Sequence, residues 1–238
     1  MKTLAAALLS FALAGCAVEK AGPPALDPAA FVEARARLAS LTRDIPAERT
    51  EKISLTIEAP YIPAGISARG AVAVRAPDSL RMILLGPGGT TAMDLWSRGE
   101  RFRFAVPAID RTIVGDAGTP MEERRGLPVD FLRWWMLRPL GGRLLAARRV
   151  GGDLEVLLDD GGRVTTATLK DDGNVLAHRR WWSDERGVVD EEWLEATGLG
   201  CATVRYRQKS TSLSVVAVCE SRRDGASAKA FDEPKEGG

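Results

Sequence analysis

The chain has 238 residues, and its 33 basic and 32 acidic side chains leave a formal net charge of +1. It contains no run of five or more like charges, which argues against a nucleic-acid partner and against a polybasic membrane patch. Hydrophobic residues make up 45% of the chain, as in ordinary globular cores, and no later segment reaches the roughly 18 apolar residues of a membrane-spanning helix.

The first sixteen residues have the pattern of a secretion signal. Lys2 supplies a positive charge, and the apolar run from Leu4 to Leu13 is too short to span a bilayer, which needs about 20 residues. The following Leu13-Ala14-Gly15-Cys16 resembles the lipobox of bacterial lipoprotein precursors. That resemblance implies cleavage before Cys16 and attachment of three acyl chains, palmitate among them, enough for stable anchoring. An ordinary signal with a chance cysteine is the alternative.

One amphipathic helix follows a short tether that contains Gly22-Pro23-Pro24. Asp27 is expected to cap the helix, with Pro28 at its first position. Apolar residues then recur at helical spacing. They are Phe31, Ala34, Leu38 and Leu41.

From about residue 49 the pattern changes to short alternating strands separated by turn residues. The clearest hairpin spans residues 90–107, with Arg98-Gly99 as its two-residue turn. That turn predicts the pairs Leu95 with Phe102, Met93 with Phe104, and Asp94 with Arg103. One face of the sheet would then be apolar and the other wet.

Two further turns are expected at Asp172-Gly173, which would pair Leu169 with Leu176, and at Asp160-Gly161. In total the sequence predicts about ten or eleven strands, nearly all joined by short turns. The expected fold is therefore mainly β, an antiparallel meander in an α+β chain.

A second helix interrupts the strands between Pro128 and Gly141-Gly142. It is apolar around most of its circumference, so it must bury most of its surface. Two helices covering the concave face of a curved sheet is the simplest packing. The tryptophans of this helix, Trp134 and Trp135, suit either a plain core or the lid of a cavity.

Cys201 and Cys219 form an even pair, as expected in an oxidising compartment. Both flank a predicted hairpin, and a three-residue loop at residues 209–211 would place them directly opposite each other. A two-residue loop at Ser210-Thr211 would instead set Cys201 against Glu220. The sequence leaves the disulfide open between these two registers.

Two segments resemble the LolA/LolB family of lipoprotein carriers and outer-membrane receptors. Residues 81–91, RMILLGPGGTT, match the family's strand that runs into a Pro-x-Gly-(Ser/Thr)-Thr turn. Residues 126–137, GLPVDFLRWWML, resemble its Pro-initiated helix with a central Arg-Trp pair. The order of lipobox, first helix, meander, second helix and remaining strands also agrees.

The resemblance implies an incomplete antiparallel β-barrel whose two helices cover an apolar cavity for acyl chains. We therefore expect a signal peptide over residues 1–15, an acylated N-terminus and tether over 16–26, one half-barrel domain over 27–231 and a loose tail over 232–238. The cavity candidates are Met82, Leu84, Met93, Leu95, Phe102, Phe104, Phe131, Trp134, Trp135, Met136 and Leu137. Methionine and leucine adapt well to flexible chains, although burial in a core would select the same residues.

The sequence departs from the family at the Pro-x-Gly turn. The receptor carries an exposed leucine there that is thought to help insert cargo into the membrane, whereas this chain has Gly88. Cavity binding is unaffected by this change, whereas glycine offers no side chain for the insertion step. Tyr61 and Ile62, in an apolar loop between two prolines, are substitute candidates for membrane contact, or they fold back onto the core.

The motifs of common enzymes are absent from the sequence. The single histidine, His178, has no partner cluster, and no nucleophile elbow, metalloprotease motif or phosphate-binding loop occurs. We therefore expect no catalytic residue, no metal site and no cofactor, and a lipid-modifying hydrolase ranks last.

Two functions remain. The first is an outer-membrane lipoprotein, facing the periplasm, that binds the acyl chains of a lipoprotein or lipid as a receptor or carrier, with a periplasmic carrier protein as a possible partner. The second is a structural or envelope-assembly lipoprotein whose core is filled by its own side chains. Ala17 after the acylated cysteine implies the outer membrane under the enteric sorting rule, because aspartate there marks inner-membrane retention.

Overall fold

The fold is given by a computed structural model that describes residues 27–59, 62–116, 118–124, 126–183 and 187–234. Cys16, the signal peptide and the tether lie outside the described residues, as do Tyr61 and the side chain of Ile62. None of the described helices is long and apolar enough to cross a bilayer.

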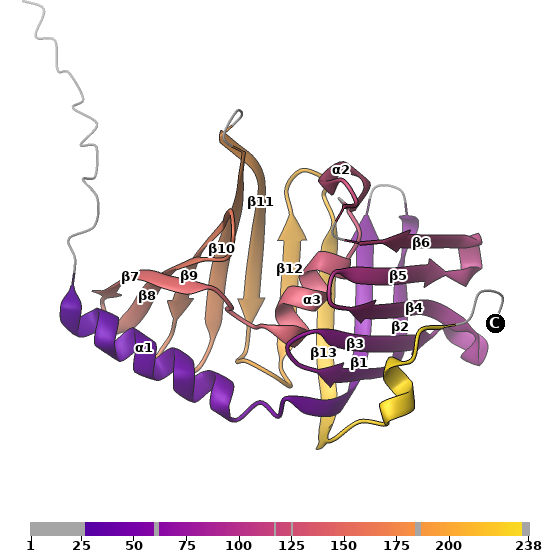
Figure 1. The fold of residues 1–238 in the computed structure, drawn as a ribbon, viewed down its shortest axis with the longest axis horizontal. Coiled ribbons are helices and arrows are strands. Elements are labelled where there is room, and N and C mark those ends of the chain that lie inside the picture. The colour runs from indigo at the N-terminus through magenta and orange to yellow at the C-terminus, as the bar shows by residue number, and fades with distance from the viewer. Residues whose placement is uncertain (1–26, 60–61, 117, 125, 184–186, 235–238) are drawn as a thin grey trace, which may run out of the picture.

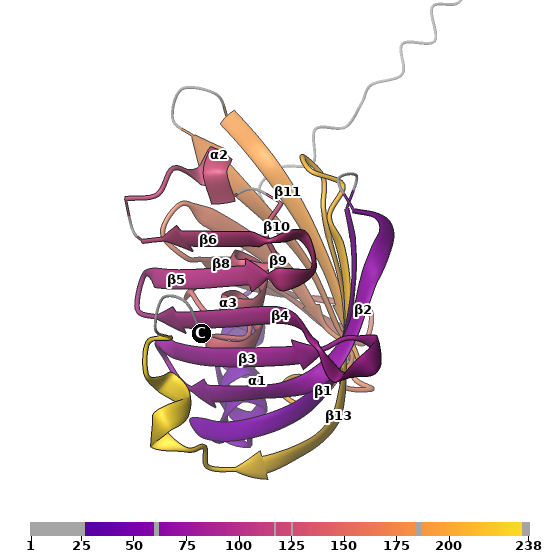
Figure 2. The ribbon, with the colours of Figure 1, turned by 90° about the vertical axis from the view of Figure 1, so that its right-hand side faces the viewer.

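A single antiparallel sheet of thirteen strands forms the body of the described chain (Figures 1 and 2). The strands are β1 (Glu48–Ala59), β2 (Ile62–Arg75), β3 (Ser79–Leu85), β4 (Thr91–Arg98), β5 (Arg101–Val106), β6 (Arg111–Gly115), β7 (Arg143–Val150), β8 (Asp153–Asp159), β9 (Arg163–Leu169), β10 (Val175–Ser183), β11 (Gly187–Ala196), β12 (Thr203–Gln208) and β13 (Ser214–Asp224). The predicted fold class is confirmed, with thirteen strands in place of ten or eleven. The five-residue β6 shows little alternation in burial, so its sequence gives a weak strand signal.

The sheet consists of two meanders joined side by side. Its strand order is β6-β5-β4-β3-β2-β1-β13-β12-β11-β10-β9-β8-β7, so the first and last strands of the chain meet in the middle. The edge strands β6 and β7 are neighbours in sequence and lie at opposite ends of the sheet. Residues 116–142 must therefore cross from one edge to the other.

That crossing connection carries the helices α2 (Met121–Arg124) and α3 (Val129–Leu137). Figure 1 shows α3 in front of the sheet, and it contacts β2 and β3. Seven of its nine residues are buried, as its apolar circumference predicts. The four-residue α2 was not expected from the sequence.

The other helix, α1 (Pro28–Arg43), packs on β7 and β8 of the second meander. The predicted cap is confirmed: the Asp27 side chain accepts a hydrogen bond from the Ala30 backbone N–H at 2.9 Å. Ala30 and Ala34 are buried, and Leu38 and Leu41 pack against the core. Two helices thus share the concave face, one for each meander.

The predicted hairpin registers are wrong, although the faces of the first hairpin are right. In the β4–β5 hairpin the turn is Gly99-Glu100, which shifts the pairing by two residues, so Leu95 lies opposite Phe104 and Asp94 opposite Ala105. Gly99 takes φ +58°, and glycine suits the first turn position of a hairpin that needs positive φ there. A shift of two residues keeps every side chain on its face.

The other two turns also differ from prediction. Between β9 and β10 the loop has three residues, with Gly173 at φ +87°, so Leu169 lies opposite Val175 and Leu176 is turned outward. Between β8 and β9 the turn residues are Gly161-Gly162, both at positive φ, as two-residue hairpins of the primed type require.

Cys201 and Cys219 form a disulfide, with their Cα atoms 5.0 Å apart. Of the two registers that the sequence leaves open, the structure has that of the two-residue loop, because β12–β13 pairs Thr203 with Val218. Cys201 lies before the first residue of β12, so the pairing of β12 with β13 does not fix its position. The bridge therefore forms in the register that was expected to prevent it.

The double substitution Cys201→Ser, Cys219→Ser should lower the free energy of unfolding by about 3 kcal/mol, because the bridge closes a loop of 18 residues in the unfolded chain. Urea unfolding of the oxidised protein and the variant measures this difference. Reductant should bring the parent chain to the midpoint of the variant and leave the variant unchanged. Equal midpoints without reductant would contradict a stabilising role.

Candidate functional site

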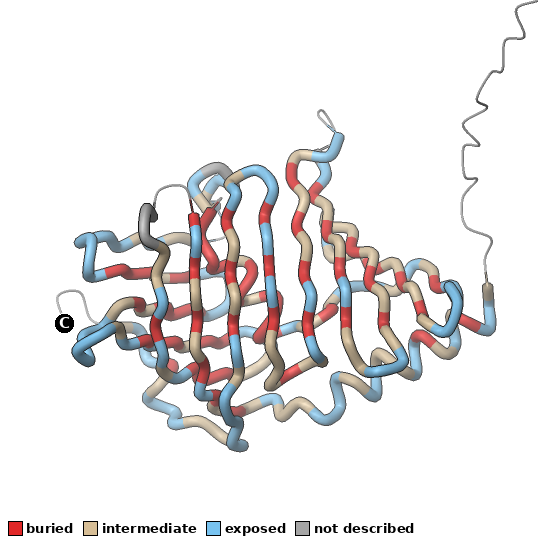
Figure 3. Tube along the Cα trace, turned by 180° about the vertical axis from the view of Figure 1, so that it is seen from behind, coloured by how far each residue is buried: buried red, intermediate tan, exposed pale blue. Residues whose placement is uncertain are grey.

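The apolar side chains of the first meander gather beneath α3. Alternate residues of each strand point to the concave face, and all eleven predicted cavity residues are buried there, with exposed fractions between 0 and 7%. They belong to one hydrophobic cluster. The structure therefore brings together the residues chosen from the sequence, with α3 as their cover. Figure 3 shows the burial alternating along the strands from behind.

Little space remains between α3 and the sheet. The apolar cavity at the N-terminal end of α3 has a volume of about 30 Å³, room for no more than a few water molecules. Ile57, Met93, Phe104 and Leu127 are among its lining residues. An acyl chain does not fit in this cavity between α3 and the first meander in this arrangement, and Trp135 and its neighbours pack as core.

The cavity leads to the rim formed by β5 and β6. Ile109 and Arg111 line its outer part and are exposed, whereas Ile113 is half-buried. Ile109 is 58% exposed. The residues that line this small cavity therefore extend from the rim to the start of α3.

The C-terminal end of α3 is joined to β1 by a hydrogen bond from a buried arginine, which is ion-paired within β1. Arg49 and Glu51 are almost completely buried, and their side chains lie 2.6 Å apart. Arg49 Nη2 also donates to the backbone carbonyl of Met136 at 2.8 Å. This arginine satisfies a carbonyl of the last helical turn that has no partner within the helix.

A polar network lies on the concave face of β10, β11 and β12. The Tyr206 hydroxyl donates to Glu192 Oε1 at 2.8 Å, and its ring stacks on Phe131 of α3 at 4.2 Å. Glu192 faces Arg179 at 3.5 Å. Nearby, Asp190 accepts a hydrogen bond from Gln208 Nε2 at 2.7 Å. The apolar surface under α3 thus ends at a band of buried polar groups.

Burial governs the ionisation of this network. It raises the pKa of Glu192, against the opposing effect of the Arg179 guanidinium and the Tyr206 hydroxyl. It lowers the pKa of Arg179, with the Glu192 carboxylate opposing. The pKa of Tyr206 lies well above its usual value of 10.0, through burial and the neighbouring Glu192. Burial therefore opposes the charged forms of Glu192 and Arg179, and the partners of each group in the network stabilise its charge.

No sequence motif indicates this network. The available signal was a set of polar residues at the inward-facing positions of three consecutive strands, β10, β11 and β12. These residues are Arg179, Asp190, Glu192, Tyr206 and Gln208. These residues are widely spaced in sequence and match no motif. Their proximity follows from the pairing of β10 with β11 and of β11 with β12, and the sequence alone predicts neither of these two registers.

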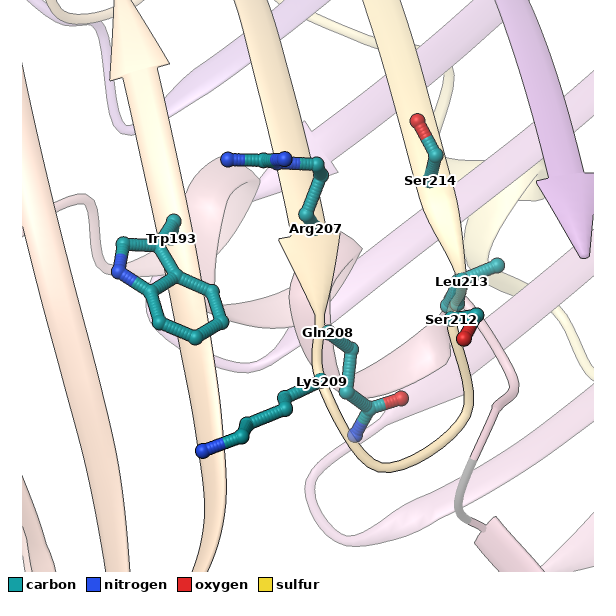
Figure 4. A pocket seen from close by; sticks show the side chains of 7 residues that line it. All are labelled: Trp193, Arg207, Gln208, Lys209, Ser212, Leu213 and Ser214. Carbon is teal, nitrogen blue, oxygen red and sulfur yellow. The ribbon is translucent and has the colours of Figure 1, made fainter.

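His178 lies on the outer face of the sheet. Its Nε2 atom is 2.9 Å from Glu191 Oε2, and its ring stacks on Trp193 at 5.1 Å. A neighbouring pocket of about 350 Å³ is lined by Trp193, Arg207 and Lys209, with serines of the β12–β13 turn at its far side (Figure 4). Hydrogen bonds with Lys209 and His178 lower the pKa of Glu191. His178 and its neighbours therefore form ring-stacking and ion-pair contacts on the outer surface of the strands.

The Pro-x-Gly turn contains a short 3₁₀ segment, Pro87–Gly89, between β3 and β4. Gly88 takes φ +81° and is exposed, and a Cβ there would meet nothing within 4 Å. Leucine at this position would have room but would be strained by about 1–2 kcal/mol. Among the described residues no group of His, Cys, Asp or Glu is arranged to hold a metal ion.

Comparisons with known proteins find likeness in structure alone, since no family model and no curated protein matches the sequence. A LolA superfamily protein from Nitrosomonas europaea is 10% identical, with a TM-score of 0.53 over 84% of this chain and 97% of that chain. The chain has the LolA fold. A DUF1329 family protein from Desulfovibrio piger is 11% identical, with a TM-score of 0.51 over 86% and 96%. The predicted LolA/LolB-like architecture is confirmed at the level of fold.

Within this LolA fold, Tyr206→Phe should lower the free energy of unfolding by about 1.5–3 kcal/mol, because it removes a hydrogen bond to a buried carboxylate and keeps the ring stacked on Phe131. Chemical denaturation measures the change. Thr56→Val is the matched control, since it removes an exposed hydroxyl that contacts Ser67 and should change stability by less than about 0.5 kcal/mol. Equal effects of the two substitutions would show that the network contributes nothing.

Proposed function

We propose that this protein is a lipoprotein anchored in the outer membrane through Cys16 and facing the periplasm, and that it binds the acyl chain of a lipoprotein or lipid on its concave face. One observation carries the proposal: the apolar surface of the first meander is covered by a short helix on a crossing connection, not by another layer of the sheet. Binding and release require no covalent step.

The mechanism we propose is exchange of α3 for the acyl chain. Both are apolar, so the sheet loses one apolar cover and gains another, at about 25 cal/mol for each Å² kept from water. Glycines at positive φ stand on either side of α3, Gly126 at +83° and Gly142 at +130°. Release of the Arg49 hydrogen bond to the Met136 carbonyl would free the C-terminal end of the helix. The chain would enter from the rim beside Ile113.

The alternative is a structural or envelope-assembly lipoprotein that keeps α3 in place and transfers no lipid. The 30 Å³ cavity favours it, since the interior is filled by the protein's own side chains. Gly88 favours it as well, because the turn projects no apolar side chain. Binding measurements separate the two functions.

The full chain carrying Cys16→Ala should bind a fluorescent fatty-acid probe, and native mass spectrometry should detect co-purified phospholipid or acylated peptide. Ile113→Glu should weaken probe binding at least about tenfold, because a carboxylate at the rim must lose water as the apolar chain passes. Val114→Glu is the matched control, since the neighbouring side chain points outward and is 68% exposed. A chain free of lipid that binds no probe would support the assembly function instead.

The anchor is tested separately. Export of the unmodified chain should give a membrane-bound product that incorporates labelled palmitate, whereas Cys16→Ala should appear in the soluble periplasmic fraction without label. Cys201→Ser serves as the control and should keep the label. Labelling of the Cys16→Ala chain would contradict acylation at this cysteine.

A further inference from the structure

A second cavity lies on the opposite side of α3 from the rim of β6. It has a volume of about 430 Å³. The turns at residues 77–78 and 99–100 of the first meander form one wall, and residues 160–163 together with Arg179, Trp181 and Trp182 of the second meander form the other. Side chains of α2 and α3 complete the lining. We call this cavity the arginine cleft.

Five arginines and four carboxylates line the arginine cleft. They are Arg124, Arg133, Arg138, Arg163 and Arg179, with Asp78, Glu100, Asp130 and Asp160. Asp130 is shared between Arg163 at 3.4 Å and Arg124 at 3.7 Å. Glu100 faces Arg133 at 3.4 Å, and Asp160 faces Arg179 at 3.5 Å. Three of the carboxylates are therefore already compensated by cations.

The arginines, in contrast, keep unused donors. The Arg179 side chain is only 2% exposed, yet its Nε, Nη1 and Nη2 atoms have no hydrogen-bond partner among the described residues. Its nearest carboxylate oxygens, on Glu192 and Asp160, each lie 3.5 Å away. The Nε atoms of Arg124 and Arg133 and the indole Nε1 of Trp181 are also buried without a partner in the described chain.

Six buried donor nitrogens thus belong to side chains that line one cleft. Buried donors are nearly always satisfied in folded proteins, and leaving one unsatisfied is unfavourable. A ligand that offers several acceptor oxygens and no donors would satisfy them. An oxyanion has this chemistry, and the guanidinium fork matches the oxygens of a phosphoryl group in particular.

Aromatic rings adjoin the same arginines. The Arg179 guanidinium lies 4.6 Å above the Trp134 ring, and the Arg163 guanidinium lies 4.3 Å above the Trp181 ring. These contacts hold the two guanidinium groups in position. Trp182, at the rim of the cleft, is 47% exposed. A ligand with an apolar part beside its anionic group would therefore find both surfaces here.

We infer that the arginine cleft is a binding site for a phosphoryl group, held by Arg179 with the Trp181 indole N–H and the neighbouring arginines. The group comes either from an anionic phospholipid headgroup or from free phosphate. The inference goes beyond acyl-chain binding and depends on other residues, since only Trp134 and Leu137 are shared with the cavity candidates.

The test is isothermal titration of the full chain carrying Cys16→Ala, with tryptophan fluorescence as a second signal. The probes are inorganic phosphate, dihexanoyl phosphatidylglycerol below its micelle concentration, and uncharged dihexanoylglycerol. We expect one phosphate or one phosphatidylglycerol per chain and no binding of dihexanoylglycerol. Binding of phosphate alone assigns the site to free phosphate, whereas binding of the lipid but not phosphate assigns it to a headgroup.

Arg179→Gln should weaken this binding at least about tenfold. Arg180→Gln is the matched control: it makes the same change on the next residue of β10, which lines a pocket on the other face of the sheet, and should leave the affinity within about twofold. Trp181→Phe removes the indole donor while keeping an aromatic ring, and should weaken binding several-fold. It decides the matter if Arg179→Gln fails to fold.

Three results would overturn the inference: no binding of either anionic probe, equal affinity of the Arg179→Gln chain, or equal binding of dihexanoylglycerol. The site is also separable from the acyl-chain proposal. Ile113→Glu, at the opposite rim, should leave phosphate or headgroup binding unchanged even where it abolishes binding of the fatty-acid probe.

Discussion

The need to cover the concave face of one large curved sheet governs this structure. A sheet with an apolar face is stable only when another layer excludes water from that face. Here the cover comes from two short helices, α1 over the second meander and α3 over the first. The helix α3 reaches its place because the chain must travel from β6 to β7, at opposite ends of the sheet. The strand order therefore places α3 over the apolar face that it covers.

The same helix separates two environments that differ in chemistry. On the side of β1 to β5, α3 packs against apolar side chains with almost no space left. On the side of the β8–β9 turn and β10, Arg133 and Trp134 of α3 border a larger cavity rich in arginine. A molecule with an acyl chain and an anionic group carries both kinds of surface. The two proposals for this protein therefore concern the two sides of one helix.

The sequence predicted the helices α1 and α3, the mainly β fold and the buried residues of the concave face, because each rests on a local pattern. Asp27-Pro28 defines a helix start, and the periodicity of Met93, Leu95, Phe102 and Phe104 survives a shift of two residues in register. The registers themselves depend on which two or three residues form each turn. Pairs such as Gly99-Glu100 and Gly161-Gly162 are chosen by backbone φ angles, which composition indicates only loosely. The polar network of Arg179, Glu192 and Tyr206 could not be predicted, since it needs those registers to be known.

The pairing of β1 with β13 also has a consequence for biogenesis. Arg49 is the partner of Asp224 in this ladder, so the central seam of the sheet joins residues 175 positions apart. During synthesis, β1 therefore keeps one open edge until nearly the whole chain has emerged, and open edges invite pairing with other chains. Chains cut short before residue 214 would keep that edge exposed permanently. Chaperone protection of the nascent polypeptide is thus most needed for its earliest strand, and for the longest time.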